Sequence, residues 1–179
     1  MEYAGLAIFK NDKLVGWFNE KESKGYNYIE DNVQSTIGQI DCPSGGILAV
    51  DVIRTKTRMK GKVEGGNPQI IVDVFLEENV AEVQCEIDLM DPEHIKELEE
   101  TAQKEVQSIM EAAIQKAKKY NVDIFGFGEA LYRADPAYWN KNKDNWKEQF
   151  ADLPVLVKAE VKIRRLGTVS DSLAQKAKE

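Results

Sequence analysis

The chain has 179 residues with 24 Lys and Arg against 31 Asp and Glu, which gives a formal net charge of −7. This length predicts one domain with a sizeable core. The acidic balance argues against a general nucleic-acid binder, which needs a net basic surface. No apolar run approaches the roughly 20 residues that cross a bilayer, and no signal peptide precedes Glu2.

The N-terminal third predicts a hairpin, a helix and a strand. Residues 3–9 and 13–18 read as paired strands with Asn11-Asp12 as their turn. Residues 20–32 favour a short helix, which Gly25 weakens. A strand over 36–41 comes next, and the turn-forming run at 42–46 ends it.

Four further segments alternate as strands do. They cover 47–60, 70–76, 80–89 and 155–164, and Glu78-Asn79 is expected to make a bend before the third of them. Each has one polar face, which is typical of an antiparallel or mixed sheet that is open to water on one side.

One long amphipathic helix is predicted from Pro92 to Tyr120. Asp91 is a good N-cap, and proline suits the first helical position. Apolar side chains recur at steps of three and four and form one stripe: Ile95, Leu98, Ala102, Val106, Ile109, Met110, Ala113, Ala117 and Tyr120. The stripe is the natural cover for the apolar face of the sheet, so the fold class is α+β.

The remaining segments complete the predicted domain. Two short helices follow the long one, the first over 129–133 and the second beginning at Asp135-Pro136. We expect a single domain over residues 3–168 and a polar, frayed tail over 169–179.

Cys42 and Cys85 are the two cysteines of the chain. An even pair permits one disulfide in an oxidising compartment. Cys85 alternates with apolar neighbours, and Cys42 precedes a proline in a turn. The interpretation favoured here is a pair without a bridge, in which Cys85 is a small buried hydrophobe. The spacing does not suggest a metal site.

Residues that could carry catalysis are scarce. Gly126-Phe127-Gly128 follows a helix rather than a strand, so it does not fit a dinucleotide loop. These glycines instead predict a tight turn, with Phe125 and Phe127 in the core. His94 is the only histidine and is expected at the surface, where it has no nucleophile to activate. We expect neither a catalytic site nor a cofactor.

Two surface features are the candidates for recognition. A basic strip, Arg54, Lys56, Arg58, Lys60 and Lys62, lies on one face of the 47–60 strand and its extension. It is either a solvated face that a neighbouring acidic strand neutralises, or a contact for anionic lipid headgroups or an acidic partner. Trp139 and Trp146, with Tyr138 and Phe150, form an aromatic cluster that either packs in the core or meets a partner.

Several segments resemble one family in the same order along the chain. They include GLAIFKNDKLVGWFN, DVIRTKTRMK, AEVQCEIDLMDP, KYNVDIFGFGEALYR, PAYW and VKIRRLG. Together they resemble the C-terminal domain of the C subunit of Ger-type spore germinant receptors, the Ger(x)C family. The segment from Phe125 to Glu129 matches a family motif, so Gly126, Gly128, Glu129 and Arg133 carry over as family-typical residues. We expect Glu129 to have a structural role as an acceptor of buried backbone or arginine hydrogen bonds.

The resemblance implies a function as well as a fold. It implies a non-enzymatic receptor domain that works with membrane-embedded A and B subunits, in a lipoprotein held on the outer face of the spore inner membrane through an upstream cysteine. It does not identify the nutrient. The alternative is a small-ligand-binding module that uses the groove between the sheet and the aromatic helices. A hydrolase that uses carboxylates is the least favoured hypothesis.

Overall fold

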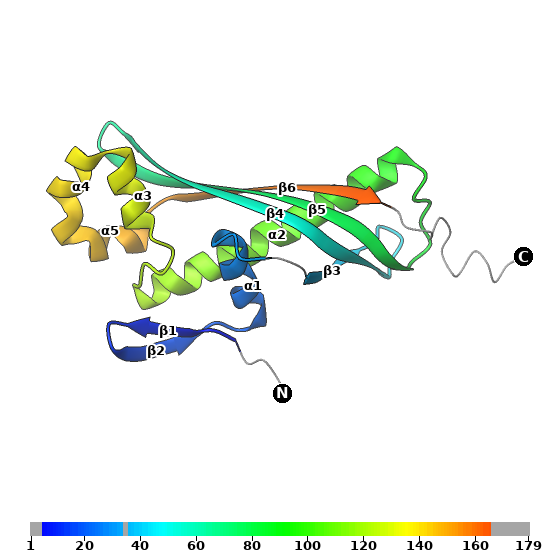
Figure 1. Cartoon of the computed structure of the whole chain (residues 1–179), viewed down its shortest axis with the longest axis horizontal. Helices are drawn as coiled ribbons and strands as arrows, with labels where there is room; N and C mark the ends of the chain where they lie inside the picture. The colour runs from blue at the N-terminus through cyan, green and yellow to red at the C-terminus, as the bar shows by residue number, and fades with distance from the viewer. Residues whose placement is uncertain (1–4, 34–35, 166–179) are drawn as a thin grey trace, which may run out of the picture. The chain divides into compact units, whose positions relative to one another are not determined.

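The structure is a computed structural model that describes residues 5–33 and 36–165. Its elements are labelled in Figure 1: β1 Ala7–Lys10, β2 Lys13–Trp17, α1 Glu20–Ile29, β3 Thr36–Asp41, β4 Ile47–Glu64, β5 Asn67–Gln84, α2 Pro92–Tyr120, α3 Phe127–Ala134, α4 Pro136–Asn142, a short 3₁₀ turn η1 Lys143–Asn145, α5 Trp146–Asp152 and β6 Val155–Arg165. The predicted tail over 169–179 lies outside the described residues.

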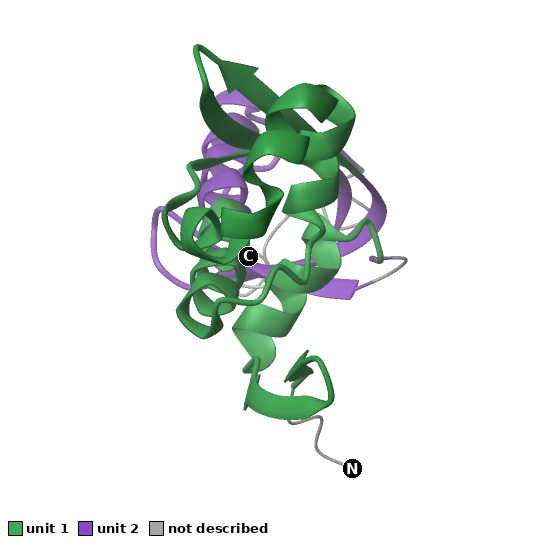
Figure 2. Ribbon diagram, turned by 90° about the vertical axis from the view of Figure 1, so that its left-hand side faces the viewer, with its two compact units in different colours: residues 1–32, 57–74, 107–158 green, residues 33–56, 75–106, 159–179 purple. Residues whose placement is uncertain are grey.

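The chain divides into two compact units, which Figure 2 colours separately. Unit 1 comprises residues 1–32, 57–74 and 107–158, and unit 2 comprises 33–56, 75–106 and 159–179. Strands β4, β5 and β6 and helix α2 each contribute residues to both units. A single domain over 3–168 stays a prediction.

Strands β3 to β6 form one sheet in the order β3-β4-β5-β6, and β1 and β2 form a separate two-stranded ribbon. β3 pairs antiparallel with β4, from Thr36 opposite Val52 to Asp41 opposite Ile47. β5 and β6 point the same way in Figure 1, so the sheet is mixed. Helix α2 buries most of the predicted stripe, including Leu98, Ala113 and Ala117, while Ile95 and Tyr120 at its two ends are half-buried. The predicted α+β class is confirmed.

The predicted bend at Glu78-Asn79 is wrong, because β5 runs without a break from Asn67 to Gln84. Glu78 is a buried strand residue with 3% of its surface exposed, so its polarity does not mark a turn. The buried positions change from even to odd numbers where Ala81 and Glu82 are both exposed. Residues 85–89, predicted as strand, lie outside it.

In unit 1, helix α1 lies against α2 at Gly25. A Cβ atom at this position would stand 2.1 Å from the backbone oxygen of Ile109. Glycine therefore lets the two helices approach closely, at the cost in helix propensity noted above. Residues 30–32 were predicted as helix, but α1 ends at Ile29.

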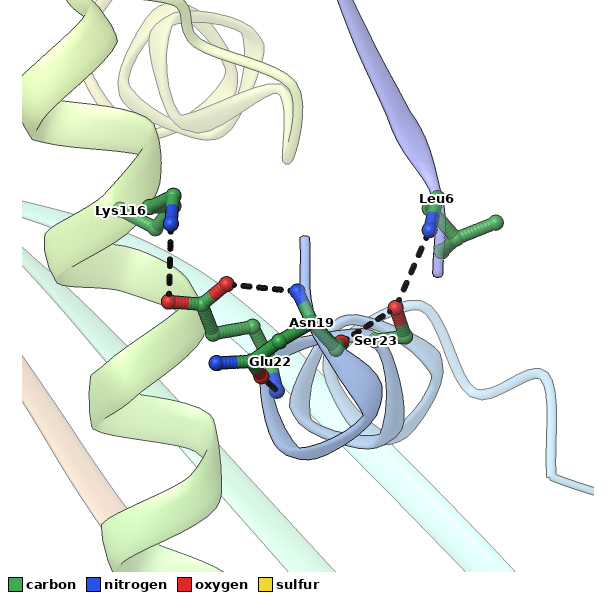
Figure 3. A network of polar contacts seen from close by, with 5 residues as sticks. All are labelled: Leu6, Asn19, Glu22, Ser23 and Lys116. Atoms are coloured by element: carbon green, nitrogen blue, oxygen red, sulfur yellow. Dashed lines mark hydrogen bonds and ion pairs between the residues drawn. The ribbon is translucent and has the colours of Figure 1, made fainter. Parts of the chain in front are cut away.

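A polar network fixes the start of α1 in unit 1 (Figure 3). Asn19 and Glu22 form a reciprocal capping box, with 2.8 Å bonds between each side chain and the other residue's backbone N–H. Glu22 also forms an ion pair with Lys116 of α2 at 3.2 Å. The buried Ser23 hydroxyl donates to the Asn19 carbonyl and accepts from the Leu6 N–H. These bonds attach α1 to α2 and to the segment that leads into β1.

In unit 2, a disulfide joins Cys42 to Cys85, with Cα atoms 6.4 Å apart. The prediction of an unbridged pair is wrong. The turn between β3 and β4 lies against the end of β5, since a Cβ on Gly46 would stand 2.4 Å from the Gln84 carbonyl oxygen. The two cysteines are 43 residues apart in sequence, so only the strand arrangement brings them together. Both are buried, as was predicted for Cys85.

The α2 segment of unit 2 is tied to β6 through Glu99. One carboxylate oxygen accepts from the Ile163 backbone N–H at 3.0 Å, and the other pairs with Lys162 at 3.0 Å. β6 is an edge strand of the described sheet, so no further strand pairs with its outer side. The Glu99 carboxylate supplies the acceptor that the Ile163 N–H would otherwise lack.

Candidate functional site

The basic strip lies along one side of β4. Arg54, Lys56, Arg58, Lys60 and Lys62 are all exposed, as alternation in a strand requires. The other side of the strand is held by polar bonds: the Thr55 hydroxyl donates to the Val33 carbonyl at 2.9 Å, and the Thr57 hydroxyl donates to the Tyr28 carbonyl at 2.5 Å. Because that side is engaged, the cations face solvent. We call these five residues the β4 cationic row.

Neighbouring carboxylates neutralise only the ends of this row. Glu77 on β5 is 3.9 Å from Arg54, but it lies closer to Arg164 on β6, at 2.7 Å. Lys62 pairs with the exposed Glu64 at 2.8 Å. Within the part of the chain that the structure describes, Lys56, Arg58 and Lys60 have no carboxylate at ion-pair distance. The middle of the row is therefore exposed positive charge without a direct ion pair among the described residues, on a chain whose net charge is negative.

Asp123 organises the glycine-aromatic segment in unit 1. Its carboxylate accepts from the backbone N–H groups of Phe127 at 2.9 Å and Gly128 at 2.8 Å, the first two residues of α3. A third bond comes from the indole Nε1 of Trp146 at 3.2 Å. The N-cap, Gly126, has φ +70 and no side chain to supply the acceptor. Asp123 therefore takes the capping role, with a negative charge at the positive end of the helix.

The predicted tight turn is confirmed at Gly126, where φ is positive. At Gly128 glycine is needed for a different reason, which is that there is no room for a side chain. A Cβ at Gly128 would stand 2.5 Å from the Trp139 ring and 3.2 Å from the Trp146 ring. Two indole rings thus occupy the space of the missing side chain. Trp139 and Trp146 contact each other edge to face, with ring centroids 5.2 Å apart.

The aromatic cluster continues into the core of unit 1. Ring contacts connect seven residues in series: Phe18, Tyr26, Phe125, Phe127, Phe150, Trp146 and Trp139. Phe125 and Phe127 are buried, as predicted, whereas Trp139 and Trp146 are half-buried. The cluster is therefore core at one end and surface at the other.

Carboxyl groups lie beside this cluster. Burial raises the pKa of Glu30, and the charge of Asp123 raises it further. Burial also raises the pKa of Tyr26, with Glu30 adding to the effect. Sequence reasoning missed Asp123 and Glu30. The available signal for Asp123 was an acidic residue three positions before a glycine N-cap, where a carboxylate can supply the acceptor that glycine lacks.

Glu129 and Arg133 do not have the buried role expected for the glutamate. They form an exposed ion pair one helical turn apart, at 3.5 Å, and each side chain is about two-thirds exposed, at 67% and 68%. A pair of this kind contributes little to stability. An arginine was one of the two kinds of partner expected for Glu129, but the expectation of a buried glutamate is wrong.

The remaining candidates for chemistry are isolated. His94 lies in the first turn of α2, and its Nδ1 is 2.9 Å from the Asp88 carbonyl oxygen. This bond raises the pKa of His94, and the nearby Asp91, Glu97 and Asp88 raise it further. Among residues 5–33 and 36–165, no group of three or more His, Cys, Asp or Glu side chains could hold a metal ion. No helix in these ranges is both long enough and apolar enough to cross a membrane.

Comparison with known proteins identifies the class to which this fold belongs. Residues 4–167 match the family described as "Spore germination B3/GerAC like, C-terminal". The chain belongs to this family, and the resemblance seen in the sequence is confirmed. The family is that of the germinant receptor C subunits, which act in spore germination.

Particular relatives support the same assignment. The chain is 32% identical to spore germination protein KC of Bacillus subtilis (strain 168) over 98% of its length and 44% of the relative's. It is 28% identical to spore germination protein YndF of the same strain, over 94% of the chain and 43% of the relative, and 27% identical to spore germination protein GerQC of Bacillus cereus, over 93% and 46%. The chain thus spans less than half the length of these relatives.

One solved structure shares the fold. The crystal structure of the GerBC protein superposes with a TM-score of 0.80 at 22% identity, over 90% of this chain and 51% of that one. At this identity the match establishes the α+β fold.

Proposed function

We propose that this chain is a non-enzymatic recognition domain of a germinant receptor C subunit, which assembles with membrane-embedded A and B subunits. The observation that carries the proposal is the β4 cationic row, whose central residues, Lys56, Arg58 and Lys60, are exposed and lack ion-pair partners among the described residues. Such a row suits an acidic protein surface, because charge complementarity selects partners and speeds their encounter.

The proposal extends to where the domain works. The receptor lies on the outer face of the spore inner membrane, and a lipidated cysteine in the full-length protein holds the subunit there. Support comes from the family membership. The half-buried Trp139 and Trp146 are a second candidate contact, because tryptophan is enriched at interfaces.

A non-enzymatic role is supported by the isolation of the reactive groups. The only histidine of the sequence, His94, bonds to a backbone carbonyl. The raised pKa values of Glu30 and Tyr26 follow from burial beside the aromatic cluster. The small-ligand alternative gains no specific support, since the two indole rings pack against each other and against Gly128.

Co-purification of the receptor tests the proposal. The subunit with Arg54→Glu, Lys56→Glu and Arg58→Glu should fold normally but should not co-purify with the A and B subunits from detergent-solubilised spore membranes. A matched control carries Lys96→Glu, Lys104→Glu and Lys147→Glu, which change the net charge equally at exposed positions off the sheet. Equal recovery of A and B with both variants would remove the row from the assembly surface.

A further inference from the structure

The β1–β2 ribbon exposes an apolar face that the proposed function does not use. Phe9 and Trp17 are each 54% exposed and Leu14 is 48% exposed. In the ribbon Phe9 lies opposite Leu14, and Ala7 lies opposite Trp17. A register shift between Ile8 and Phe9 brings Leu14 and Trp17, three residues apart, onto the same exposed side.

The other side of the ribbon is already packed. Ile8 is 2% exposed, and the Tyr120 ring at the end of α2 lies so close to Gly16 that a Cβ there would be 2.3 Å from it. The ribbon is therefore fixed to the body of unit 1 by one face. Its Phe9, Leu14 and Trp17 side chains do not serve the core.

Two lysines flank the tip of this ribbon. Lys10 and Lys13 lie opposite each other beside the Asn11-Asp12 turn, in which Asn11 has φ +56. Aromatic side chains next to lysines are typical of membrane–water interfaces, where the rings sit at headgroup level and the cations reach lipid phosphates. In both Figure 1 and Figure 2 the ribbon lies at the bottom of unit 1 and the β4–β5 turn lies at its top.

We propose that the Phe9, Leu14 and Trp17 face of the β1–β2 ribbon, with Lys10 and Lys13, binds the headgroup region of an anionic phospholipid bilayer. Three half-exposed side chains of this size present roughly 300 Å². A stable protein interface needs about 800 Å² from each partner, so the patch is small for a second copy or another protein. Shallow insertion of a few side chains among lipid headgroups does not require a buried area of that size.

Vesicle co-sedimentation with this chain tests the inference. The protein should bind vesicles of phosphatidylglycerol mixed with phosphatidylcholine and should bind pure phosphatidylcholine more weakly. Trp17→Ser and Phe9→Ser should each weaken partitioning by at least about tenfold. Lys10→Glu with Lys13→Glu should remove the preference for the anionic lipid. Unchanged circular dichroism and melting temperature would show that these variants fold.

Matched controls separate this face from general stickiness. Ile37→Ser and Met90→Ser remove apolar side chains that are 68% and 71% exposed elsewhere, and both should bind vesicles like the parent chain. The inference is overturned if the parent chain binds no vesicles, if it binds both lipids equally, or if the controls lose binding as Trp17→Ser does. Self-association that Trp17→Ser abolishes, without vesicle binding, would instead assign the face to a second copy.

The inference extends the proposed function, because a receptor subunit works at a membrane, but its test is independent. Vesicle binding requires neither the A nor the B subunit. Failure of co-purification with Arg54→Glu, Lys56→Glu and Arg58→Glu, and failure of vesicle binding with Trp17→Ser, can therefore be told apart. The β4 triple variant should bind vesicles normally.

Discussion

The indole N–H of Trp146 donates to the Asp123 carboxylate over 3.2 Å, and the same carboxylate caps α3. One side chain thus orients both the first of the short helices and a ring of the aromatic cluster. The position of the half-buried Trp146 consequently depends on Asp123, which belongs neither to α3 nor to the aromatic cluster.

We expect Asp123→Ala to lower the free energy of unfolding by about 1–3 kcal/mol, because it removes a helix cap and leaves part-buried N–H donors without an acceptor. Asp123→Asn keeps one acceptor oxygen and should cost less. Urea denaturation measures both values, and near-ultraviolet circular dichroism follows the tryptophans. An Asp123→Ala variant as stable as the parent chain would show that the cap is dispensable.

Gly25→Ala is expected to destabilise the protein by about 1–3 kcal/mol, although alanine is the better helix former. The new Cβ meets the Ile109 backbone oxygen, and backbone cannot move aside as a side chain can. Lys24→Ala, at an exposed position of the same helix, should change the free energy of unfolding by less than about 0.5 kcal/mol. Urea denaturation of both variants decides the matter, and a stabilising Gly25→Ala would contradict the close approach of α1 and α2.

Because Glu78 is a buried carboxyl group, we expect the free energy of unfolding to fall as the pH rises. Burial raises the pKa of this carboxyl from 4.5 to about 7, and its Oε2 has no hydrogen-bond partner. The native state therefore holds a proton that the unfolded chain releases at lower pH. The associated stability is complete below pH 4.5 and is lost as the pH rises to about 7, with a maximum of about 3 kcal/mol.

The measurement is the free energy of unfolding of the parent chain and of Glu78→Gln, each at pH 5 and pH 8. The parent should lose more stability than the variant between these values, by up to about 3 kcal/mol. The difference between the two proteins isolates Glu78 from other groups that titrate in this range. Parallel behaviour would mean that Glu78 is ionised in the native state.

Reduction of the Cys42–Cys85 disulfide should lower the free energy of unfolding by about 2–4 kcal/mol, because the bridge closes a long loop in the unfolded chain. The double variant Cys42→Ser with Cys85→Ser should match the reduced protein and should not respond to reductant. Mass spectrometry of the unreduced chain gives an independent check, since two free thiols would contradict the bridge.

Regular patterns allowed much of the fold to be predicted. The strand over 36–41 and the helix over 92–120 have their predicted limits, because a turn-forming run ends the first and a cap and proline begin the second. The β4 strand extends beyond the predicted residue 60 to Glu64. Lys62 and Glu64 continue the alternation of exposed charged residues up to the Gly65-Gly66 turn.

The failures share a physical cause, which is that tertiary context overrides a local signal. Glu78 resembles a strand end, yet the strand continues and buries it. Cys42 and Cys85 meet only because a turn folds onto the end of β5. The helix cap that Asp123 provides had a local signal in the sequence, whereas its bond to Trp146 depends on how α5 packs.

Germination of spores that carry the full-length subunit with Arg54→Glu, Lys56→Glu and Arg58→Glu tests the central claim most directly. Exposed charges contribute little to folding, so the variant subunit should be present at the parent level, while the response to the receptor's nutrient should be strongly impaired. Spores with Lys96→Glu, Lys104→Glu and Lys147→Glu should respond normally. Normal germination at normal subunit levels with the β4 variant would contradict the claim that this row is the surface through which the domain works.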